Sequence, residues 1–267
     1  MKSISLKNKV GIVTGGASGI GKGIVMGLAE ADAHVAIADI NMDAARKLAE
    51  EIAAAGLPKA VAVEVDVTDE TSVARMVEAV KTEFGRVDIL VNNAGIAPSS
   101  RLVDFDKAAW DKTLQINCTG YFLCARAVAS VMIEQGEGGN IINISSKSGV
   151  RGSADNSAYN ATKFAAIGLA QGWARELAQY GIRVNSVLPG NVLRGSGIWN
   201  REYIEARARK AGIKPEEVEA YYNKQVPLGR QCEPADVANT VVYLVSDLAS
   251  YITGCSHLVD GGQEMRA

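Results

Sequence analysis

The chain has 267 residues, a formal net charge of -2 and 48% hydrophobic residues. Its length allows one large domain or two small ones, and its hydrophobic content is ordinary for a globular protein. The small net charge gives no electrostatic footprint for nucleic acid, and the short apolar runs argue against a membrane-spanning helix. The first residues lack the apolar segment of a secretory signal. We therefore expect neither a nucleic-acid nor a membrane partner.

Cysteine and histidine usage indicates a reduced protein without a metal. The four cysteines form no CxxC pair and predict no disulfide framework. The two histidines, His34 and His257, have no neighbouring cysteine or carboxylate at metal-ligand spacing. We expect no metal site and a cytoplasmic location.

Short apolar runs alternate with segments of helical spacing along the whole chain. The predicted strands are 10–14, 34–39, 60–66, 87–91, 140–145, 183–188 and 256–260. The predicted helices are 20–31, 43–55, 71–84, about 107–134 and one that holds Tyr159 and Lys163 and runs to about Gln179. Strands that are apolar throughout and alternate with helices predict a parallel sheet covered on both faces.

The predicted fold class is therefore α/β: a single Rossmann domain over residues 1–267, with a doubly wound, seven-stranded parallel sheet. The region between 190 and 225 is polar and charged, with short helices near 201–211 and 216–224. We expect it to form a small helical lid over the substrate.

The turn after the first strand predicts a phosphate-binding site. It reads Thr14-Gly-Gly-Ala-Ser-Gly-Ile-Gly21, a Gly-x3-Gly-x-Gly spacing. Ligands of such sheets bind at the carboxyl ends of the strands, where glycines let the backbone approach a pyrophosphate and a helix N-terminus supplies amides. A plain tight turn is the alternative, but the strand before it and the helix after it favour a cofactor.

Acidic and amide residues extend this site along the same edge. A carboxylate at Asp39 can accept hydrogen bonds from ribose hydroxyls and repel a 2′-phosphate, which favours NAD over NADP. Asp39 could instead cap the next helix, and the polar residues ending strands three and four could bond loop backbone. The candidate cofactor residues of this half are Gly15, Ser18, Gly19, Ile20, Gly21, Asp39, Ile40, Asp66, Val67, Asn93, Ala94 and Gly95.

Tyr159 and Lys163 form an acid–base pair in the predicted helix that holds both residues. Residues four apart share one helix face. A neighbouring positive charge favours the phenolate, so this Tyr can take a proton from an alcohol or return one to a ketone near neutral pH. The chain has eight Tyr, so a Lys four residues after one of them can occur by chance. The pair therefore indicates a function only together with the other motifs.

These motifs together resemble the short-chain dehydrogenase/reductase family over the whole chain. The matching residues are Thr14-Gly-x3-Gly-Ile-Gly21, Asn92-Asn-Ala-Gly95, Asn117, Ser146, Tyr159-x3-Lys163 and Pro189-Gly190. The resemblance implies that Tyr159 is the acid/base, that Lys163 lowers its pKa and holds the nicotinamide ribose, and that Ser146 bonds the substrate oxygen. It also implies that Asn117 anchors a proton-relay water, and that Pro189, Gly190 and Val192 contact the cofactor. The family's spacing of Ser and Tyr selects Ser146 over Ser145, and the family implies a homotetramer.

The substrate region departs from the family pattern. Where many members have a Thr after the Pro-Gly pair, this chain has Arg194. We expect Arg194 to reach the substrate, although solvated loop charges are the ordinary reading of such residues. The substrate candidates are Lys147, Arg151, Asn191, Arg194 and Trp199. Segments of the second half, such as Gly120-Tyr-Phe-Leu-Cys-Ala-Arg126, resemble the sorbitol-6-phosphate 2-dehydrogenases of the family.

The sequence thus predicts an NAD-dependent oxidoreductase that interconverts a secondary alcohol of a polyol or sugar with the ketone. The substrate could be a polyol phosphate such as sorbitol 6-phosphate. One alternative is an NAD(P)H-dependent reductase of a 3-oxoacyl or steroid-like ketone, which would require an apolar pocket. Another is a non-catalytic NAD-binding regulator, against which the retained Asn117, Ser146, Tyr159 and Lys163 argue.

Overall fold

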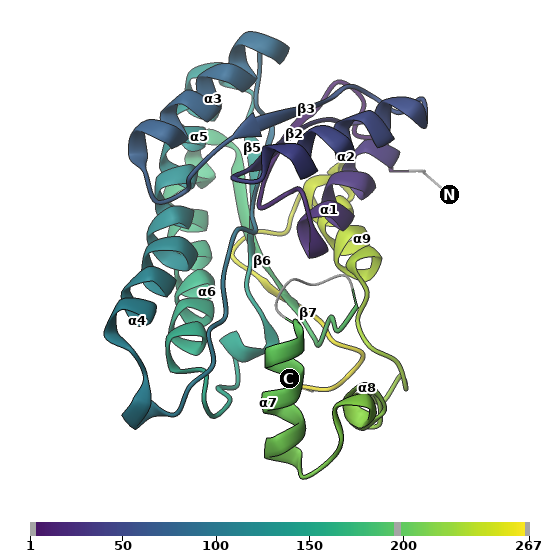
Figure 1. Ribbon diagram of the computed structural model, residues 1–267. Helices are drawn as coiled ribbons and strands as arrows, with labels where there is room; N and C mark the ends of the chain where they lie inside the picture. The colour runs from purple at the N-terminus through teal and green to yellow at the C-terminus, as the bar shows by residue number, and fades with distance from the viewer. Residues whose placement is uncertain (1–3, 195–198, 265–267) are drawn as a thin grey trace.

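A single parallel sheet of seven strands forms the centre of the molecule (Figure 1). The computed structural model describes residues 4–194 and 199–264. The strand order is β3-β2-β1-β4-β5-β6-β7, so the direction of winding reverses between β1 and β4. The strands are β1 Val10–Thr14, β2 His34–Asp39, β3 Ala60–Glu64, β4 Ile89–Asn92, β5 Gly139–Ile144, β6 Ile182–Pro189 and β7 Ser256–Val259. The predicted fold class is confirmed.

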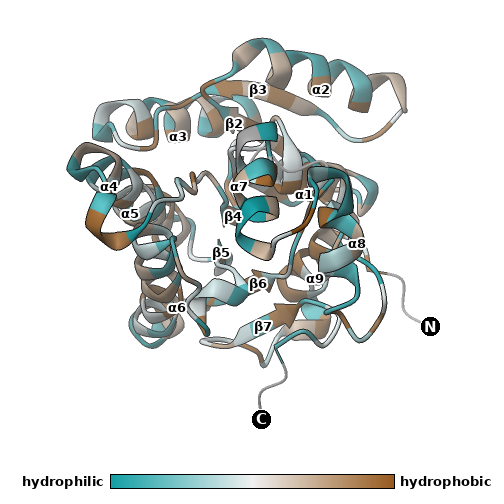
Figure 2. Cartoon of the chain, turned by 60° about the horizontal axis from the view of Figure 1, so that its bottom comes forward, coloured by the Kyte–Doolittle hydropathy of each residue, from teal (hydrophilic) through white to brown (hydrophobic). Residues whose placement is uncertain are grey.

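Helices cover both faces of this sheet, with α3 to α6 on one side and α1, α2 and α9 on the other (Figure 1). The shorter α7 and α8 lie at one end of the molecule, seen from below in Figure 2. The helices are α1 Gly19–Glu30, α2 Met42–Ala54, α3 Glu70–Phe84, α4 Lys107–Leu114, α5 Gly120–Gln135, α6 Ser157–Leu177, α7 Arg201–Ala211, α8 Val218–Asn223 and α9 Pro234–Val245.

Two apolar clusters, one on each face, pack the helices onto the sheet. Adjacent residues of a strand point to opposite faces, so Val13 of β1 joins one cluster with Ile24 of α1. Its neighbour Ile12 joins the other cluster with Leu123 of α5. The central strands β1 and β4 are buried throughout, whereas the edge strands β3 and β7 are mostly half-buried.

Helix α9 is missing from the elements that the sequence analysis predicts. Pro234 occupies its first position, and the Oδ2 atom of Asp236 accepts a hydrogen bond from the N–H of Glu233 at 2.9 Å. The helix packs tightly against α1, because a Cβ on Gly23 would lie 2.5 Å from Cβ of Pro234. Its start signal and apolar spacing are present in the sequence, so this element was predictable.

The predicted helix 107–134 is a continuous helical run with a π turn, Gln115–Thr119, between α4 and α5. By length and composition alone, Lys107–Gln135 could cross a membrane, which corrects the expectation that no apolar run is long enough. However, 56% of its apolar window is buried inside the protein, as in a core helix packed on a sheet.

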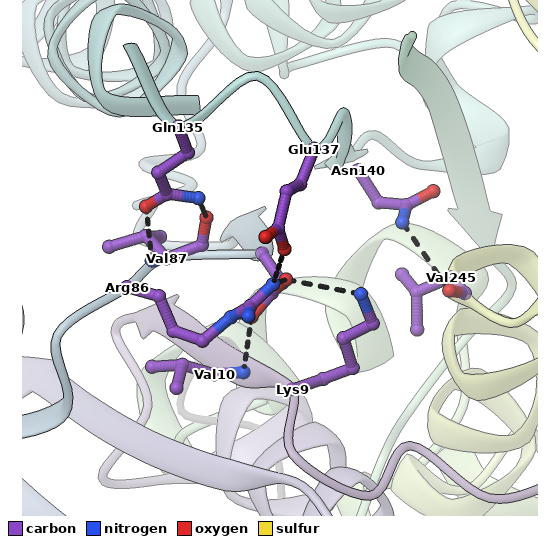
Figure 3. Close-up of polar contacts among 9 residues, drawn as sticks. Lys9, Val10, Arg86, Val87, Gln135, Glu137, Asn140 and Val245 are labelled. Carbon is purple, nitrogen blue, oxygen red and sulfur yellow. Dashed lines mark hydrogen bonds and ion pairs between the residues drawn. The ribbon is translucent and has the colours of Figure 1, made fainter. Parts of the chain in front are cut away.

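A polar network ties the amino ends of β1 and β4 together (Figure 3). Asp88 accepts hydrogen bonds from Val10 N at 2.9 Å and from Arg86 Nε at 2.8 Å, and it pairs with Lys9 Nζ at 3.2 Å. Its side chain is only 5% exposed. Burial alone would raise the pKa of Asp88, but the hydrogen bonds from Arg86 and Val10 and the two positive charges lower it overall.

Asp88→Asn should therefore destabilise the fold by about 2–3 kcal/mol at pH 7, because it leaves buried donors and Arg86 without a carboxylate. The contribution of Asp88 is present above its unfolded pKa of about 3.9 and is lost as pH falls through the lower folded value. Urea unfolding at pH 7 and at pH 3 measures both effects, and the gap between variant and wild type should narrow at the lower pH.

The matched control is Asp43→Asn, since the Asp43 side chain is 98% exposed. It should change the free energy of unfolding by less than about 0.5 kcal/mol. Equal midpoints for wild type and Asp88→Asn at pH 7 would contradict the structural role of Asp88.

Candidate active site

The turn between β1 and α1 requires glycine at two kinds of position. Gly15 and Gly19 have φ values of 61° and 57°, a left-handed backbone that disfavours a side chain. Gly21 has no room for a side chain, because a Cβ there would lie 2.0 Å from the carbonyl oxygen of Gly15. The turn leads directly into the N-terminus of α1, where free amides and the helix dipole favour an anion.

Asn93, just after β4, holds this turn in place. Its Nδ2 donates to the carbonyl oxygens of Thr14 at 2.9 Å and Gly15 at 3.0 Å. The hydroxyl of Thr14 in turn accepts hydrogen bonds from the N–H groups of Asn93 and Ala94. The side chain of Asn93 thus bonds loop backbone, as the second reading of the sequence allowed.

The carboxylate of Asp39 is held at the end of β2 by the backbone. Its Oδ2 accepts from Ala17 N at 3.0 Å and its Oδ1 from Asn41 N at 2.9 Å. The cap of α2 is Asn41, whose side chain accepts from Ala44 N. Helix capping is therefore not the role of Asp39, which instead braces the glycine turn and faces the groove beside it.

Asp66, beyond β3, also bonds its own loop. Its Oδ1 accepts from Thr68 N at 2.9 Å and from Thr68 Oγ1 at 2.7 Å. These hydrogen bonds lower the pKa of Asp66, so it is a carboxylate at neutral pH.

A groove of about 870 Å³ runs along the carboxyl ends of β1 to β5. Of the predicted cofactor residues, it is lined by Gly15, Ser18, Gly19, Ile20, Asp39, Ile40, Asp66, Val67, Asn93, Ala94, Gly95, Tyr159 and Lys163. Gly21 lies behind the turn and does not line it. Sequence reasoning missed the far wall, which α7 supplies through Tyr203, Ala206 and Arg209. The groove fits a dinucleotide, because the glycine turn and the N-terminus of α1 line one part of it and the carboxylate of Asp39 stands at the end of β2.

Lys163 is anchored between α6 and β5. Its Nζ donates to the carbonyl oxygen of Ile144 at 2.8 Å and to the hydroxyl of Tyr121 at 3.3 Å, and the residue is 4% exposed. It lies 5.5 Å from the centre of the Tyr159 ring. Burial lowers the pKa of Lys163 to about 7, so its positive charge is lost more easily than that of a surface lysine.

Tyr159 is half-buried at the meeting point of the groove and a second, smaller pocket. Burial raises the pKa of Tyr159 to about 12, and a hydrogen bond with the Ser146 side chain lowers it in part. The depressed pKa that the sequence analysis expects is therefore absent from the chain alone, because desolvation of the phenolate outweighs the effect of its neighbours.

The two serines that end β5 have different surroundings. Ser145 donates its hydroxyl to the carbonyl oxygen of Lys163 at 2.7 Å, which joins β5 to α6. Ser146 accepts from Ser148 N at 3.1 Å and bonds Tyr159. The hydroxyl of Ser146 is thus the one beside the phenol, in agreement with the choice made from the family spacing.

Asn117 lies in the π turn and is fully buried. Its Nδ2 donates to Ile96 O at 2.9 Å and to Thr162 Oγ1 at 3.2 Å, while its Oδ1 accepts from Ile96 N at 2.9 Å. The side chain joins three segments around the site. The π turn interrupts the regular helical ladder here, a feature that often marks functional sites. This turn is not among the elements predicted from the sequence.

The smaller pocket has a volume of about 190 Å³ and a polar lining. Predicted residues on its walls are Ser146, Lys147, Arg151, Tyr159, Pro189, Gly190, Asn191, Val192 and Trp199. Asn156 of the active-site loop also lines it, and residues that the sequence analysis did not name include Tyr203, Arg207, Tyr222 and Glu264. The first three come from α7 and α8 and Glu264 follows the last strand, and no local motif connects these segments to the active site.

Arg194 does not line this pocket, which corrects the expectation that it reaches the substrate. Its side chain is 75% exposed, and its Nη2 pairs with Glu219 Oε1 at 2.9 Å. Glu219 lies on α8 outside the pocket, so the guanidinium of Arg194 is already paired with a carboxylate at the protein surface.

Comparisons with known proteins agree with this geometry. A protein-family model described as Enoyl-(Acyl carrier protein) reductase matches residues 15–264. The chain is 44% identical to sorbitol-6-phosphate 2-dehydrogenase of Escherichia coli (strain K12), over 97% of this chain and 99% of that protein. It is 41% identical to galactitol 2-dehydrogenase of Agrobacterium fabrum, again over 97% and 99% of the two chains.

Among solved structures, sorbitol-6-phosphate 2-dehydrogenase SrlD from Erwinia amylovora superimposes with a TM-score of 0.91 at 44% identity, covering 96% of this chain and all of that one. Sequence, fold and site geometry therefore lead to one conclusion: the chain belongs to the short-chain dehydrogenase/reductase family of nicotinamide-dependent oxidoreductases.

Proposed function

We propose that the protein is an NAD-dependent dehydrogenase that interconverts a secondary alcohol of a polyol or sugar with the corresponding ketone. The observation that carries the proposal is the position of Tyr159, which lines both the groove and the polar pocket and lies near Ser146 in that pocket. One phenol can therefore reach a substrate in the pocket while a dinucleotide lies in the groove.

The proposed roles follow from these positions. Ser146 donates a hydrogen bond to the substrate oxygen, and Tyr159 as phenolate removes the hydroxyl proton when the alcohol is oxidised. A nicotinamide held in the groove beside Tyr159 and Lys163 would supply the hydride acceptor, and its positive ring would favour the phenolate. Lys163, already fixed by Ile144, supplies a second positive charge beside the phenol.

The pocket suits hydroxyl groups better than an acyl chain or a steroid. Among the described residues, Asn156 Oδ1 and Asn191 Nδ2 are buried without a hydrogen-bond partner, and both residues line the pocket. Buried polar atoms of this kind normally find a partner, which sugar hydroxyls would provide. Trp199 packs edge-on against Tyr203 and Tyr222, at 5.1 and 5.2 Å between ring centres, and offers a flat wall for the carbon backbone.

The preference for NAD rests on Asp39. Its carboxylate lines the groove at the end of β2, where it can accept ribose hydroxyls and would repel a 2′-phosphate. A non-catalytic regulator would need the dinucleotide groove but not the Tyr159–Ser146 contact or the polar pocket, so this alternative has less support.

We also propose that the protein is a homotetramer that packs through its long helices. Phe122 of α5 is 43% exposed and Phe164 of α6 is 49% exposed. Large apolar side chains on adjacent helices suit a face that a second copy covers.

The test of the proposed function is turnover over a panel of hexitols, pentitols, free sugars and their phosphates, plus a 3-oxoacyl thioester and a ketosteroid, each with NAD and NADP. Highest kcat/KM on a polyol or sugar with NAD supports it. Highest kcat/KM on the thioester or the steroid would replace it, and cofactor binding without any turnover would favour the regulator.

Tyr159→Phe should keep reduced-cofactor binding and lower turnover about 10²- to 10⁴-fold, because it removes the proton carrier but keeps the ring. Cofactor fluorescence measures binding, and initial rates measure turnover. The control is Tyr251→Phe, since Tyr251 is fully exposed at 102%. More than about a tenth of the wild-type rate in Tyr159→Phe would exclude the acid/base role.

Asp39→Asn should narrow the preference for NAD over NADP by about tenfold or more, because the charge that opposes the 2′-phosphate is gone. The amide keeps an acceptor for Ala17 or Asn41, so the turn should fold. Steady-state kinetics with both cofactors give the ratio of kcat/KM values. A ratio equal to that of wild type would mean that the charge of Asp39 does not select the cofactor.

A further inference from the structure

We propose that Arg207 and Lys147 form a phosphate subsite in the polar pocket, so that the preferred substrate is a monophosphate ester of a polyol. This inference rests on the proposed function and specifies its substrate. Relatives of similar identity bear names with and without a phosphate, so resemblance alone leaves the matter open.

Arg207 is a buried cation that forms no ion pair with any carboxylate whose side chain the structure describes. The residue is 8% exposed. Its Nη2 donates to the Tyr203 hydroxyl at 2.6 Å, and its guanidinium lies 4.6 Å from the centre of the Tyr203 ring. A buried guanidinium is costly unless a charged partner compensates it, and an aromatic ring replaces only part of that partner.

Lys147 is the second uncompensated cation. It lines the same pocket, is half-buried, and has no hydrogen-bond or ion-pair partner in residues 4–194 and 199–264. Burial lowers the pKa of Lys147 further than Glu264 and Asp260 raise it, and Arg151 and Arg207 also act to lower it. An anion between Lys147 and Arg207 would compensate the free-energy cost of burying the two cations and would screen their mutual repulsion.

Three carboxylates near Lys147 and Arg207 already have partners. Asp260 accepts hydrogen bonds from the N–H groups of Gly262 and Glu264. Glu264 bonds Arg151 at 3.2 Å, and Asp155 bonds Lys210 at 2.8 Å. The pocket lining thus has one carboxylate against three cations, Lys147, Arg151 and Arg207. A dianionic phosphate matches the two cations left over, and the planar donors of Arg suit its oxygens.

The subsite is connected to the reacting groups. Ser146 and Tyr159 line the same cavity of about 190 Å³, in which Arg207 comes from α7 and Lys147 directly follows Ser146. One small molecule can therefore place a hydroxyl at Tyr159 and a phosphate at Arg207. The phosphate would also hold α7 against the rest of the pocket.

The experiment compares hexitols with their 6-phosphates as substrates for wild type, Arg207→Met, Arg207→Lys and Arg201→Met. The last variant is the control, because Arg201 lies on the same helix with its side chain 94% exposed. Wild type should prefer the phosphate ester by about 100-fold or more in kcat/KM. Arg207→Met should lower that preference by about 30-fold or more, mainly by raising KM for the phosphate ester, because the ester loses a charged partner that the free hexitol never has.

Arg207→Lys should recover part of the preference, and Arg201→Met should behave as wild type. Two results would overturn the subsite: a wild type that prefers the free hexitol, or an Arg207→Met variant that loses both activities equally. The second result would mean that Arg207 only supports Tyr203 and the lid.

Failure of the proposed function would look different, since no polyol of either kind would then be turned over. In that case the subsite is tested by calorimetric titration of inorganic phosphate into protein saturated with NAD, which occupies the groove. Binding that weakens about tenfold or more in Arg207→Met and not in Arg201→Met supports the subsite. No binding to wild type, or equal binding to all variants, overturns it.

Discussion

The burial of Lys163 is the constraint on which the site depends. An ammonium inside a protein needs fixed acceptors, and the carbonyl oxygen at the end of β5 and the hydroxyl of Tyr121 supply them. These bonds fix α6 on the sheet, with Ser145 adding a second tie to the same helix. The same burial makes the charge of Lys163 and the proton of Tyr159 sensitive to any new charge nearby, which a surface pair would not be.

The groove and the smaller pocket differ in the charged side chains that line them. The groove has carboxylates, Asp39 and Asp66, at the ends of its strands, each held by backbone or hydroxyl donors. Lys163 and Arg209 balance these two carboxylates in the lining of the groove. The smaller pocket has an excess of cations. Tyr159 stands between the two cavities, so the excess of positive charge lies on the pocket side of its phenol.

Much of the fold and the chemical centre could be predicted from sequence, because both depend on local patterns. Apolar runs and turn glycines identified all seven strands to within a few residues, and the Ser146, Tyr159 and Lys163 spacing identified the residues that the structure brings together. Arg207 and Glu264 could not be found this way, since only tertiary packing brings α7 and the C-terminal loop to the pocket. Arg194 was misjudged for the same reason: its partner Glu219 is a surface residue of another helix.

The π turn at Gln115–Thr119 has a consequence for how this chain can vary. A π turn contains one residue more than the α-helical path, and each residue rotates the following helix by about 100°. Deleting one residue here would give a regular helix, but Asn117 and Tyr121 could then no longer both keep their directions. Either the contact of Asn117 with Ile96 or that of Tyr121 with Ile144 would be lost. Length variation between α4 and α5 is therefore coupled to the integrity of the site, although neither helix contains Tyr159 or Lys163.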